Sequence, residues 1–326
     1  MTRYVVKRLL LAVPTLLGIT IVTFAVVRLA PGDPAAMQLD GTPGGDSARL
    51  HEQLRAYWRL DQPLHRQYAG WLARLVTFDF GHSFVDHRPV WDKIAEKLPW
   101  TVGLAVASLG ATLALAIPIG VIMAVRAGGW FDRITGVGLY AAFSVPNYVA
   151  AGALIAAVAV IPIDWLPISG AISDDYDGLS VGGRIADVVR HALLIGICYS
   201  YPALAYQARF VRNNMLETLR QDYVRTARAN GLSRCRVIFR HAFRNTWVPL
   251  ITLLGLTIPS VVSGSVILEV MFNWPGIGRL FYASIAQRDY PTVMALSVVS
   301  AVLVLLSTLA ADIACARADP RIHDAQ

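Results

Sequence analysis

Six long apolar runs constrain this chain more than any other feature of its sequence. A helix of about 20 apolar residues crosses the roughly 30 Å hydrocarbon core of a bilayer, and each run is long enough to do so. The runs predict an all-α integral membrane protein with six transmembrane helices. The predicted spans are Leu9–Leu29, Thr101–Val125, Ile134–Ile163, Val188–Ala208, Trp247–Leu268 and Pro291–Ala311.

The composition agrees with a membrane protein. Hydrophobic residues make up 55% of the 326 residues and charged residues only 16%, whereas charge is typically about 25% in soluble domains. The net charge of +7 does not indicate nucleic-acid binding, because nine of the 29 basic residues lie in one loop between two apolar runs. The first run is longer than the apolar core of a secretory signal, which is about 7–15 residues, and we interpret it as an uncleaved span.

The distribution of charge predicts the orientation. The segment from Arg209 to Arg244 holds nine arginines and two acidic residues, and loops rich in arginine stay on the cytoplasmic side of a membrane. Both termini and the loop 126–133 then lie in the cytoplasm. The acidic loop 164–187 then lies outside, so the basic loops and the acidic loop predict the same orientation.

The chain divides into four predicted parts. Residues 1–30 are the N-terminal cytoplasmic end and first span, and residues 31–96 are a small helical extracytoplasmic insertion. Residues 97–315 form the main transmembrane domain with a cytoplasmic loop over 209–246, and residues 316–326 are a cytoplasmic tail. Within the insertion we expect helices over 47–60 and 64–76, separated by the turn Asp61-Gln62-Pro63.

The predicted spans lack ionisable residues at membrane depth that could bind or transfer a coupling ion. Ion-coupled transporters carry ionisable residues at membrane depth, and here such residues occur only near span ends. The only lysines are Lys7, Lys93 and Lys97, and none follows a glycine in a phosphate-binding G-x-x-x-x-G-K-[ST] loop. No spacing indicates a catalytic or metal site. An external energy source is therefore predicted, while an intramembrane enzyme and a stand-alone channel or receptor are the competing hypotheses.

Within the basic loop, the residues from Asp222 to Gly231 read as a short helix for docking another protein. Asp222 suits the positive N-terminal end of a helix, and Gly231 can adopt the left-handed conformation that stops one. Ala227 and Gly231 are four apart, so they share a predicted face with Tyr223, and the arginines off that face could bind acidic side chains or lipid headgroups. The predicted docking residues are Asp222, Tyr223, Arg225, Ala227, Arg228 and Gly231.

The same loop carries a family resemblance. DYVRTARANGLSRCRVIFRHAFRNTWVPLIT resembles the coupling segment of permease subunits from ATP-binding-cassette (ABC) importers, in the dipeptide, oligopeptide and nickel branch. Gly231 and Ala227 match the glycine and second alanine of the E-A-A-x-x-x-G motif, but Arg225 and Thr226 replace its glutamate and first alanine. The further blocks that resemble this branch are RLDQPLHRQYAGWL, FDFGHSFVDHRPV, LEVMFNWPGIGRLFYASIAQRDYP and DPRI.

The resemblance implies a type I importer permease in the bacterial plasma (inner) membrane. Such a subunit pairs with a second, homologous permease as a heterodimer. Two cytoplasmic ABC ATPases bind ATP and Mg, and a solute-binding protein delivers cargo from outside. The chain itself is expected to bind no cofactor and no nucleic acid. The implied cargo is a dipeptide or oligopeptide, with nickel chelate, glutathione or another small solute as alternatives.

The resemblance also points to a second site between the last two spans. The turn in LEVMFNWPGIGRLF is expected to be tight, because proline and two glycines fix its backbone. It is predicted to form an extracytoplasmic gate or a contact for the binding protein. The residues of this predicted site are Asn273, Trp274, Pro275, Gly276 and Gly278.

Overall fold

The computed structural model describes residues 2–29, 62–161, 163, 165–262 and 265–318. Within those ranges the regular elements are helices, accompanied by an isolated β-bridge between His82 and Pro89. The all-helical prediction is therefore confirmed for this part of the chain. The predicted helix over 47–60 and the tail motif that starts at Asp319 lie outside the described residues.

The chain forms two compact units. The first comprises residues 100–279 together with those from 306 onward, and the second comprises residues 2–99 with 280–305. Each unit therefore joins segments that are far apart in the sequence. The predicted four-part division of the chain stays a prediction.

Four described helices are long and apolar enough to span a membrane: α1 (Thr2–Leu29), α5 (Val90–Val125), α8 (Val181–Leu219) and α14 (Tyr290–Ala318). Counting the bent pair of α6 (Trp130–Ser144) and α7 (Asn147–Val160) as one span gives five. The remaining predicted span corresponds largely to α11 (Arg244–Val262). The chain is thus a multi-pass membrane protein, and the count of six spans stays a prediction.

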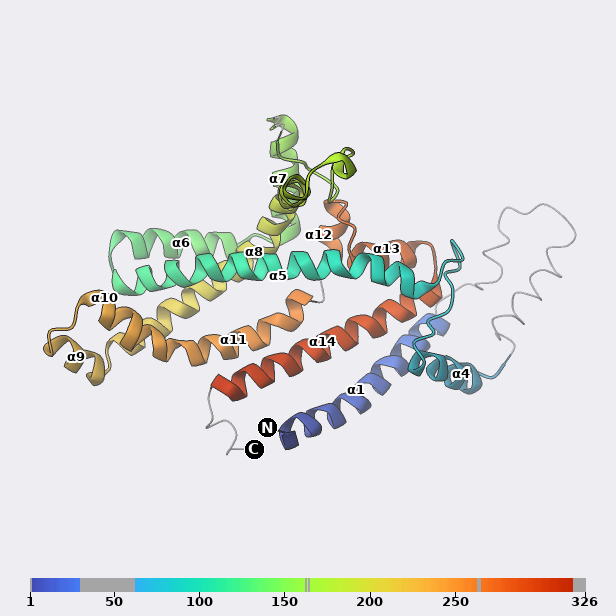
Figure 1. The fold of residues 1–326 in the computed structure, drawn as a ribbon, viewed down its shortest axis with the longest axis horizontal. Coiled ribbons are helices and arrows are strands. Elements are labelled where there is room, and N and C mark those ends of the chain that lie inside the picture. Colours follow the sequence, from blue (N-terminus) through green and yellow to red (C-terminus); the bar gives the residue numbers. More distant parts are fainter. Residues whose placement is uncertain (1, 30–61, 162, 164, 263–264, 319–326) are drawn as a thin grey trace, which may run out of the picture. The chain divides into compact units, whose positions relative to one another are not determined.

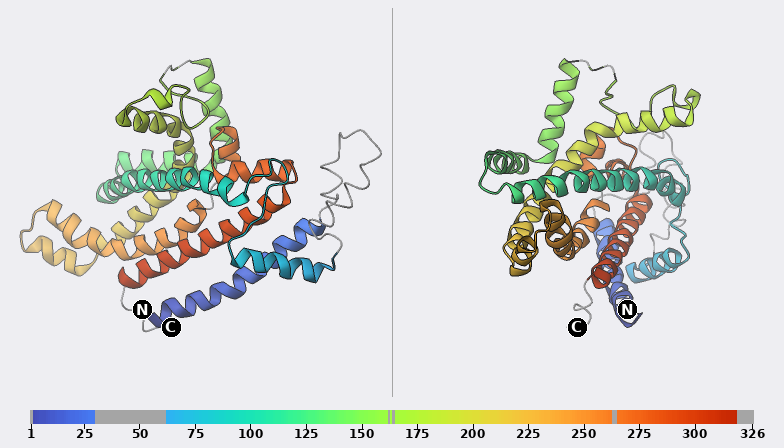
Figure 2. Two further views of the ribbon diagram at one scale, coloured as in Figure 1. Left: turned by 45° about the vertical axis from the view of Figure 1, so that its right-hand side comes forward. Right: turned by 60° about the vertical axis from the view of Figure 1, so that its left-hand side comes forward.

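The predicted span Ile134–Ile163 is not one straight helix. It is divided into α6 (Trp130–Ser144) and α7 (Asn147–Val160), which meet at an angle of 97°, and both views in Figure 2 show α7 turning away from α6. Pro146 lacks an N–H, and a proline disfavours helical backbone at the residue before it. Val145 is accordingly extended, with φ −86° and ψ 121°.

In the first unit, α8 is the helix around which the others pack. It contacts α6, α7 and α11, and Figure 1 shows it running between α6 and the short helices near residue 230. It lies against α5 at Gly120, where a Cβ atom would lie 2.5 Å from the carbonyl oxygen of Ala208 and 2.7 Å from Cβ of Val211. The absent side chain therefore allows the two backbones to touch.

In the second unit, α1 packs against α4 (Leu64–Val76) through aromatic side chains. Phe24 of α1 meets Tyr68 edge-on at 5.4 Å between ring centroids and stacks on Trp71 at 6.0 Å. The hydroxyls of Thr20 and Tyr68 are 2.9 Å apart. The α4 helix follows Pro63 and has the predicted bounds.

Short elements connect these helices. They are the 3-10 helix η1 (Tyr176–Gly178), α9 (Asp222–Ala229), α10 (Arg234–Arg236), the π-helix η2 (Val237–Phe243), α12 (Val266–Met271) and α13 (Ile277–Ala286).

Candidate functional site

The helix predicted in the basic loop is α9. It begins at Asp222, separated from the end of α8 by Arg220 and Gln221, and finishes at Ala229. Gly231 has φ +76°, and a Cβ atom there would meet nothing within 4 Å. The short helix and its glycine stop are therefore confirmed. Figure 1 shows α9 at the end of α8.

One side of α9 is buried in the chain's own apolar cluster. Val224 is fully buried and Ala227 is 6% exposed, and both pack with Val237 and with the partly buried Leu219 and Leu232. A helix of two turns has little stability of its own, so it needs such packing to persist. Ala227 is therefore covered by the chain's own side chains, and its predicted role in binding an ATPase stays a prediction.

The other side of α9 is exposed. Tyr223 is 42% exposed, and its hydroxyl accepts a hydrogen bond of 2.7 Å from Nδ2 of Asn245 at the start of α11. Asp222 and Arg225 form a surface ion pair at 3.4 Å. The exposed residues among the predicted docking set are Asp222, Tyr223, Arg225, Arg228 and Gly231. Their role in binding an ATPase stays a prediction.

An ion pair fixes α6 to α8 close to α9. Arg212 of α8 donates from Nη2 to Oδ2 of Asp132 at 2.7 Å, and the backbone N–H of Gly128 donates to the same oxygen at 2.9 Å. Three residues earlier, the guanidinium of Arg209 lies 4.1 Å from the ring centroid of Tyr140. Two arginines of α8 therefore hold it against α6.

The second predicted site is a tight turn between α12 and α13. The N–H of Trp274 donates to the carbonyl oxygen of Glu269 at 2.8 Å, and that of Asn273 donates to Val270 at 3.2 Å. These bonds and the left-handed φ of +53° at Asn273 form a Schellman motif, which ends α12. The N–H of Gly276 then donates to the carbonyl of Trp274 at 2.8 Å. The tight turn is confirmed.

The carboxyl group of Glu269 lies inside this turn and is fully buried. It accepts hydrogen bonds of 3.0 Å from the hydroxyl of Thr101 in α5 and 3.0 Å from the backbone N–H of Arg279 in α13. The Thr101 hydroxyl in turn accepts a bond of 2.8 Å from the N–H of Ile277. A single carboxyl–hydroxyl pair therefore joins α12, α13 and α5.

The two glycines of the turn leave room for that carboxyl. A Cβ atom at Gly276 would collide with the carboxyl atoms of Glu269, and one at Gly278 would lie 2.9 Å from Cα of Val266. Trp274 also contacts α5. Its indole N–H donates to the carbonyl oxygen of Trp100 at 3.3 Å, and the two rings meet edge-on with 5.6 Å between their centroids.

The turn exposes few of its predicted contact residues. Trp274, Gly276 and Gly278 are buried, and the prediction that the turn contacts a binding protein stays a prediction. Asn273 is exposed and Pro275 is half-buried. A role for this turn as an extracytoplasmic gate stays a prediction.

A second buried carboxyl group, that of Asp289, lies in the other unit and accepts several hydrogen bonds. Asp289 is 1% exposed and accepts hydrogen bonds from the hydroxyls of Ser83 and Thr292, both at 2.6 Å, and from the N–H of Phe84 at 2.9 Å. Lys93 Nζ lies 3.4 Å from Asp289 and 2.9 Å from Ser83 Oγ. These bonds join the segment before α5 to the start of α14.

Lys93 also pairs with Asp86 at 3.0 Å. Burial alone would raise the pKa of the Asp86 carboxyl, but hydrogen bonds from Lys93, Ser83 and the backbone of Arg88 together lower it below its ordinary value. The carboxylate is therefore held in its ionised form.

Comparison with known proteins identifies the family. Residues 116–324 match the model of the binding-protein-dependent transport system inner membrane component, and residues 1–105 match the N-terminal model of the same kind of membrane component. The chain belongs to this family. It is a permease subunit of an ABC importer.

Several permeases are similar to this one over their whole length. It is 39% identical to the oligopeptide transport system permease protein AppB of Bacillus subtilis, over 99% of this chain and 100% of that protein. It is 36% identical to the dipeptide transport system permease protein DppB of Escherichia coli K12, over 99% of each. It is 34% identical to the glutathione transport system permease protein GsiC of the same strain, also over 99% of each.

A solved structure shows the fold of the permease. A chain of the MetNI methionine ABC transporter in an inward-facing conformation aligns with a TM-score of 0.53 and 16% identity, covering 71% of this chain and 99% of that one. The permease therefore has the fold of a type I importer permease. ATP hydrolysis in such importers belongs to separate subunits.

Proposed function

We propose that this permease forms half of the path by which an importer carries short peptides across the bacterial inner membrane. The observation that carries the proposal is the similarity along 99% of the chain to permeases named for oligopeptide and dipeptide transport. In this arrangement the chain has six spans, both termini in the cytoplasm and an external insertion over 31–96. It binds no cofactor itself.

The proposed assembly has four further components. A homologous permease completes the path, two ABC ATPases bind ATP and Mg on the cytoplasmic side, and a solute-binding protein delivers the peptide. The exposed side of α9 supports this assignment, because it offers Tyr223, Arg225 and Arg228 on a helix whose opposite side is anchored in the permease. A rigid element between two proteins can transmit a conformational change.

The cargo is tested by uptake into proteoliposomes that contain the purified complex, its binding protein and enclosed ATP. We expect labelled dipeptide or oligopeptide uptake that unlabelled peptide abolishes. The similarity to a glutathione permease supports glutathione, itself a short peptide, as the second candidate. Uptake that only glutathione inhibits would assign the second candidate. Uptake that nickel chelate inhibits, and that neither dipeptide, oligopeptide nor glutathione inhibits, would refute the peptide assignment.

The coupling role is tested by Gly231→Glu. The position has φ +76° and open space around it, so the new side chain would project where an ATPase is proposed to bind. ATP-driven uptake should fall at least about tenfold while the protein still inserts. The control is Gly231→Ala, which has the same backbone strain of about 1–2 kcal/mol but little bulk. Full uptake by the glutamate variant would contradict the docking assignment.

A further inference from the structure

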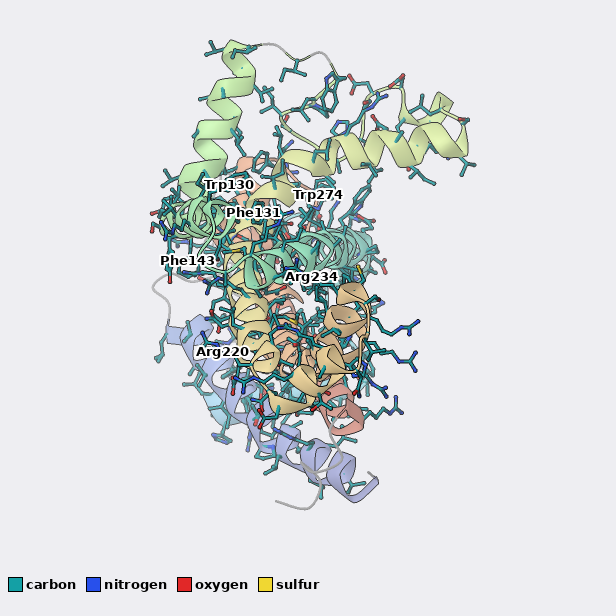
Figure 3. All side chains as sticks on the ribbon, turned by 90° about the vertical axis from the view of Figure 1, so that its left-hand side faces the viewer. Trp130, Phe131, Phe143, Arg220, Arg234 and Trp274 are labelled. Atoms are coloured by element: carbon teal, nitrogen blue, oxygen red, sulfur yellow. The ribbon has the colours of Figure 1, made fainter. Side chains whose placement is uncertain are left out.

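A row of alternating basic and aromatic side chains follows the exposed side of α10, η2 and the start of α11. Phe239 is 59% exposed and Trp247 is 42% exposed, and the three arginines of the row are exposed as well. Figure 3 shows nitrogen-tipped side chains projecting from this end of the molecule, near the labelled Arg234. We name this row the arginine–aromatic stripe; its residues are Arg236, Phe239, Arg240, Phe243, Arg244 and Trp247.

The aromatic part of the stripe is continuous. Phe239 and Phe243 meet edge-on at 6.5 Å between ring centroids, and Phe243 and Trp247 do so at 5.4 Å. In a π-helix a step of four residues is slightly less than one turn, and in an α-helix it is slightly more. The two deviations have opposite directions. A row of residues four apart that crosses from η2 into α11 therefore stays on one side of the helix. The opposite side packs inward through Val237, Ala242, Thr246 and Leu250, which are all buried.

The charge of this region favours an anionic partner. Between Asp222 and Glu269 the sequence contains six arginines and no acidic residue. Arg225, at the start of this stretch, pairs with Asp222 on α9. The arginines of the stripe have no acidic neighbour in sequence with which to pair. Either anionic phospholipid or an acidic protein surface would complement them.

The aromatic residues favour phospholipid. Tryptophan and tyrosine concentrate where a span meets the headgroups, because their rings are amphipathic. The stripe leads directly into the apolar residues of α11, and its last member is Trp247. Trp130, at the start of α6 on the same predicted side of the membrane, is 71% exposed. The proposed ATPase contact lies on a separate element, α9.

We infer that the arginine–aromatic stripe binds anionic phospholipid headgroups of the cytoplasmic leaflet and so holds the start of α11 at the membrane surface. The inference rests on the orientation in the proposed function but not on the cargo. Arginines near an anionic surface each add to membrane attraction, and the aromatic rings fix the depth of the helix. The site would bind phosphatidylglycerol in preference to phosphatidylcholine.

The test uses the whole complex of two permeases and two ATPases in phosphatidylcholine nanodiscs. A photoreactive phosphatidylglycerol is added, and labelled peptides are mapped by mass spectrometry. We expect labelling of residues 236–247 by this probe and little by photoreactive phosphatidylcholine. The variant R236Q/R240Q/R244Q should reduce the phosphatidylglycerol labelling by about tenfold or more.

A matched variant removes the same charge outside both the stripe and α9. R126Q/R133Q/R220Q replaces three other exposed arginines and should keep the lipid labelling of residues 236–247. If the glutamine stripe variant does not assemble, R236K/R240K/R244K keeps the charge and should still be labelled.

Three results would overturn the inference: equal labelling by both lipids, unchanged labelling of the glutamine stripe variant, or lost labelling of the lysine variant. Loss of the ATPases from the glutamine stripe variant, with lipid labelling unchanged, would assign the stripe to a protein surface instead. A complex that is labelled as expected but imports no peptide would refute only the proposed cargo.

Discussion

Replacing Thr101 by valine tests whether the buried carboxyl of Glu269 holds the external turn in place. The Thr101 hydroxyl is buried, donates to Glu269 at 3.0 Å and accepts from the N–H of Ile277 at 2.8 Å. Valine has nearly the same shape as threonine. The substitution therefore removes both hydrogen bonds while it leaves the packing of α5 almost unchanged.

The expected cost follows from the groups that lose a partner. A buried polar group without a hydrogen bond costs about 1–3 kcal/mol, and Thr101→Val leaves two such groups. The carboxyl of Glu269 keeps the N–H of Arg279 as a donor, so its share should lie at the low end. We expect the free energy of unfolding to fall by about 2–4 kcal/mol.

The assay is denaturant unfolding of the purified permease in detergent, followed by tryptophan fluorescence, because Trp100 and Trp274 lie beside the turn. Thr112→Val is the matched control: Thr112 is equally buried, but its hydroxyl makes one long bond of 3.4 Å to Ser200. That variant should lose less than about 1 kcal/mol. Equal losses for Thr101→Val and Thr112→Val would refute the role assigned to Glu269.

Two further predictions concern packing and pH. Gly120→Ala should destabilise the permease by about 1–3 kcal/mol, because the added Cβ would lie 2.5 Å from the carbonyl of Ala208, whereas Gly110→Ala has open space and should be neutral by the same unfolding assay. The pKa of Asp86 is lowered from its ordinary 3.8, so its contribution to stability is present above that value and is lost as the pH falls through the lower pKa of the folded state. When the free energy of unfolding is measured from pH 6 down to about pH 3, the Asp86→Asn variant should lose less stability than the wild type. Equal losses in the two proteins would show that the contact with Lys93 contributes nothing.

Local signals in the sequence predict two helices, α4 and α9. Pro63 marks the start of α4, and Asp222 with Gly231 delimits α9, because each residue acts on the backbone beside it. Which side of α9 is buried cannot be predicted from these local signals, because it depends on contacts with other elements. Ala227 turns inward because Val237, from another element, supplies the apolar surface that covers it.

The links between distant residues could not be predicted in this way. Thr101 and Glu269 are 168 residues apart, and Ser83 and Asp289 are 206 apart. Glu269 adjoins an apolar run, which by pattern alone indicates only the end of a span. Hydropathy also hides the bend at Pro146, since the residues on either side of it are equally apolar.

The proline inside α8 has a mechanical consequence. The helix holds 39 residues with Pro202 in its interior, and an interior proline removes a backbone hydrogen bond and bends a helix. From Pro202 to Leu219 the helix extends for about 25 Å. A change of about 10° at the proline therefore moves the end beside α9 by about 4 Å, while the residues near Val181 can keep their place.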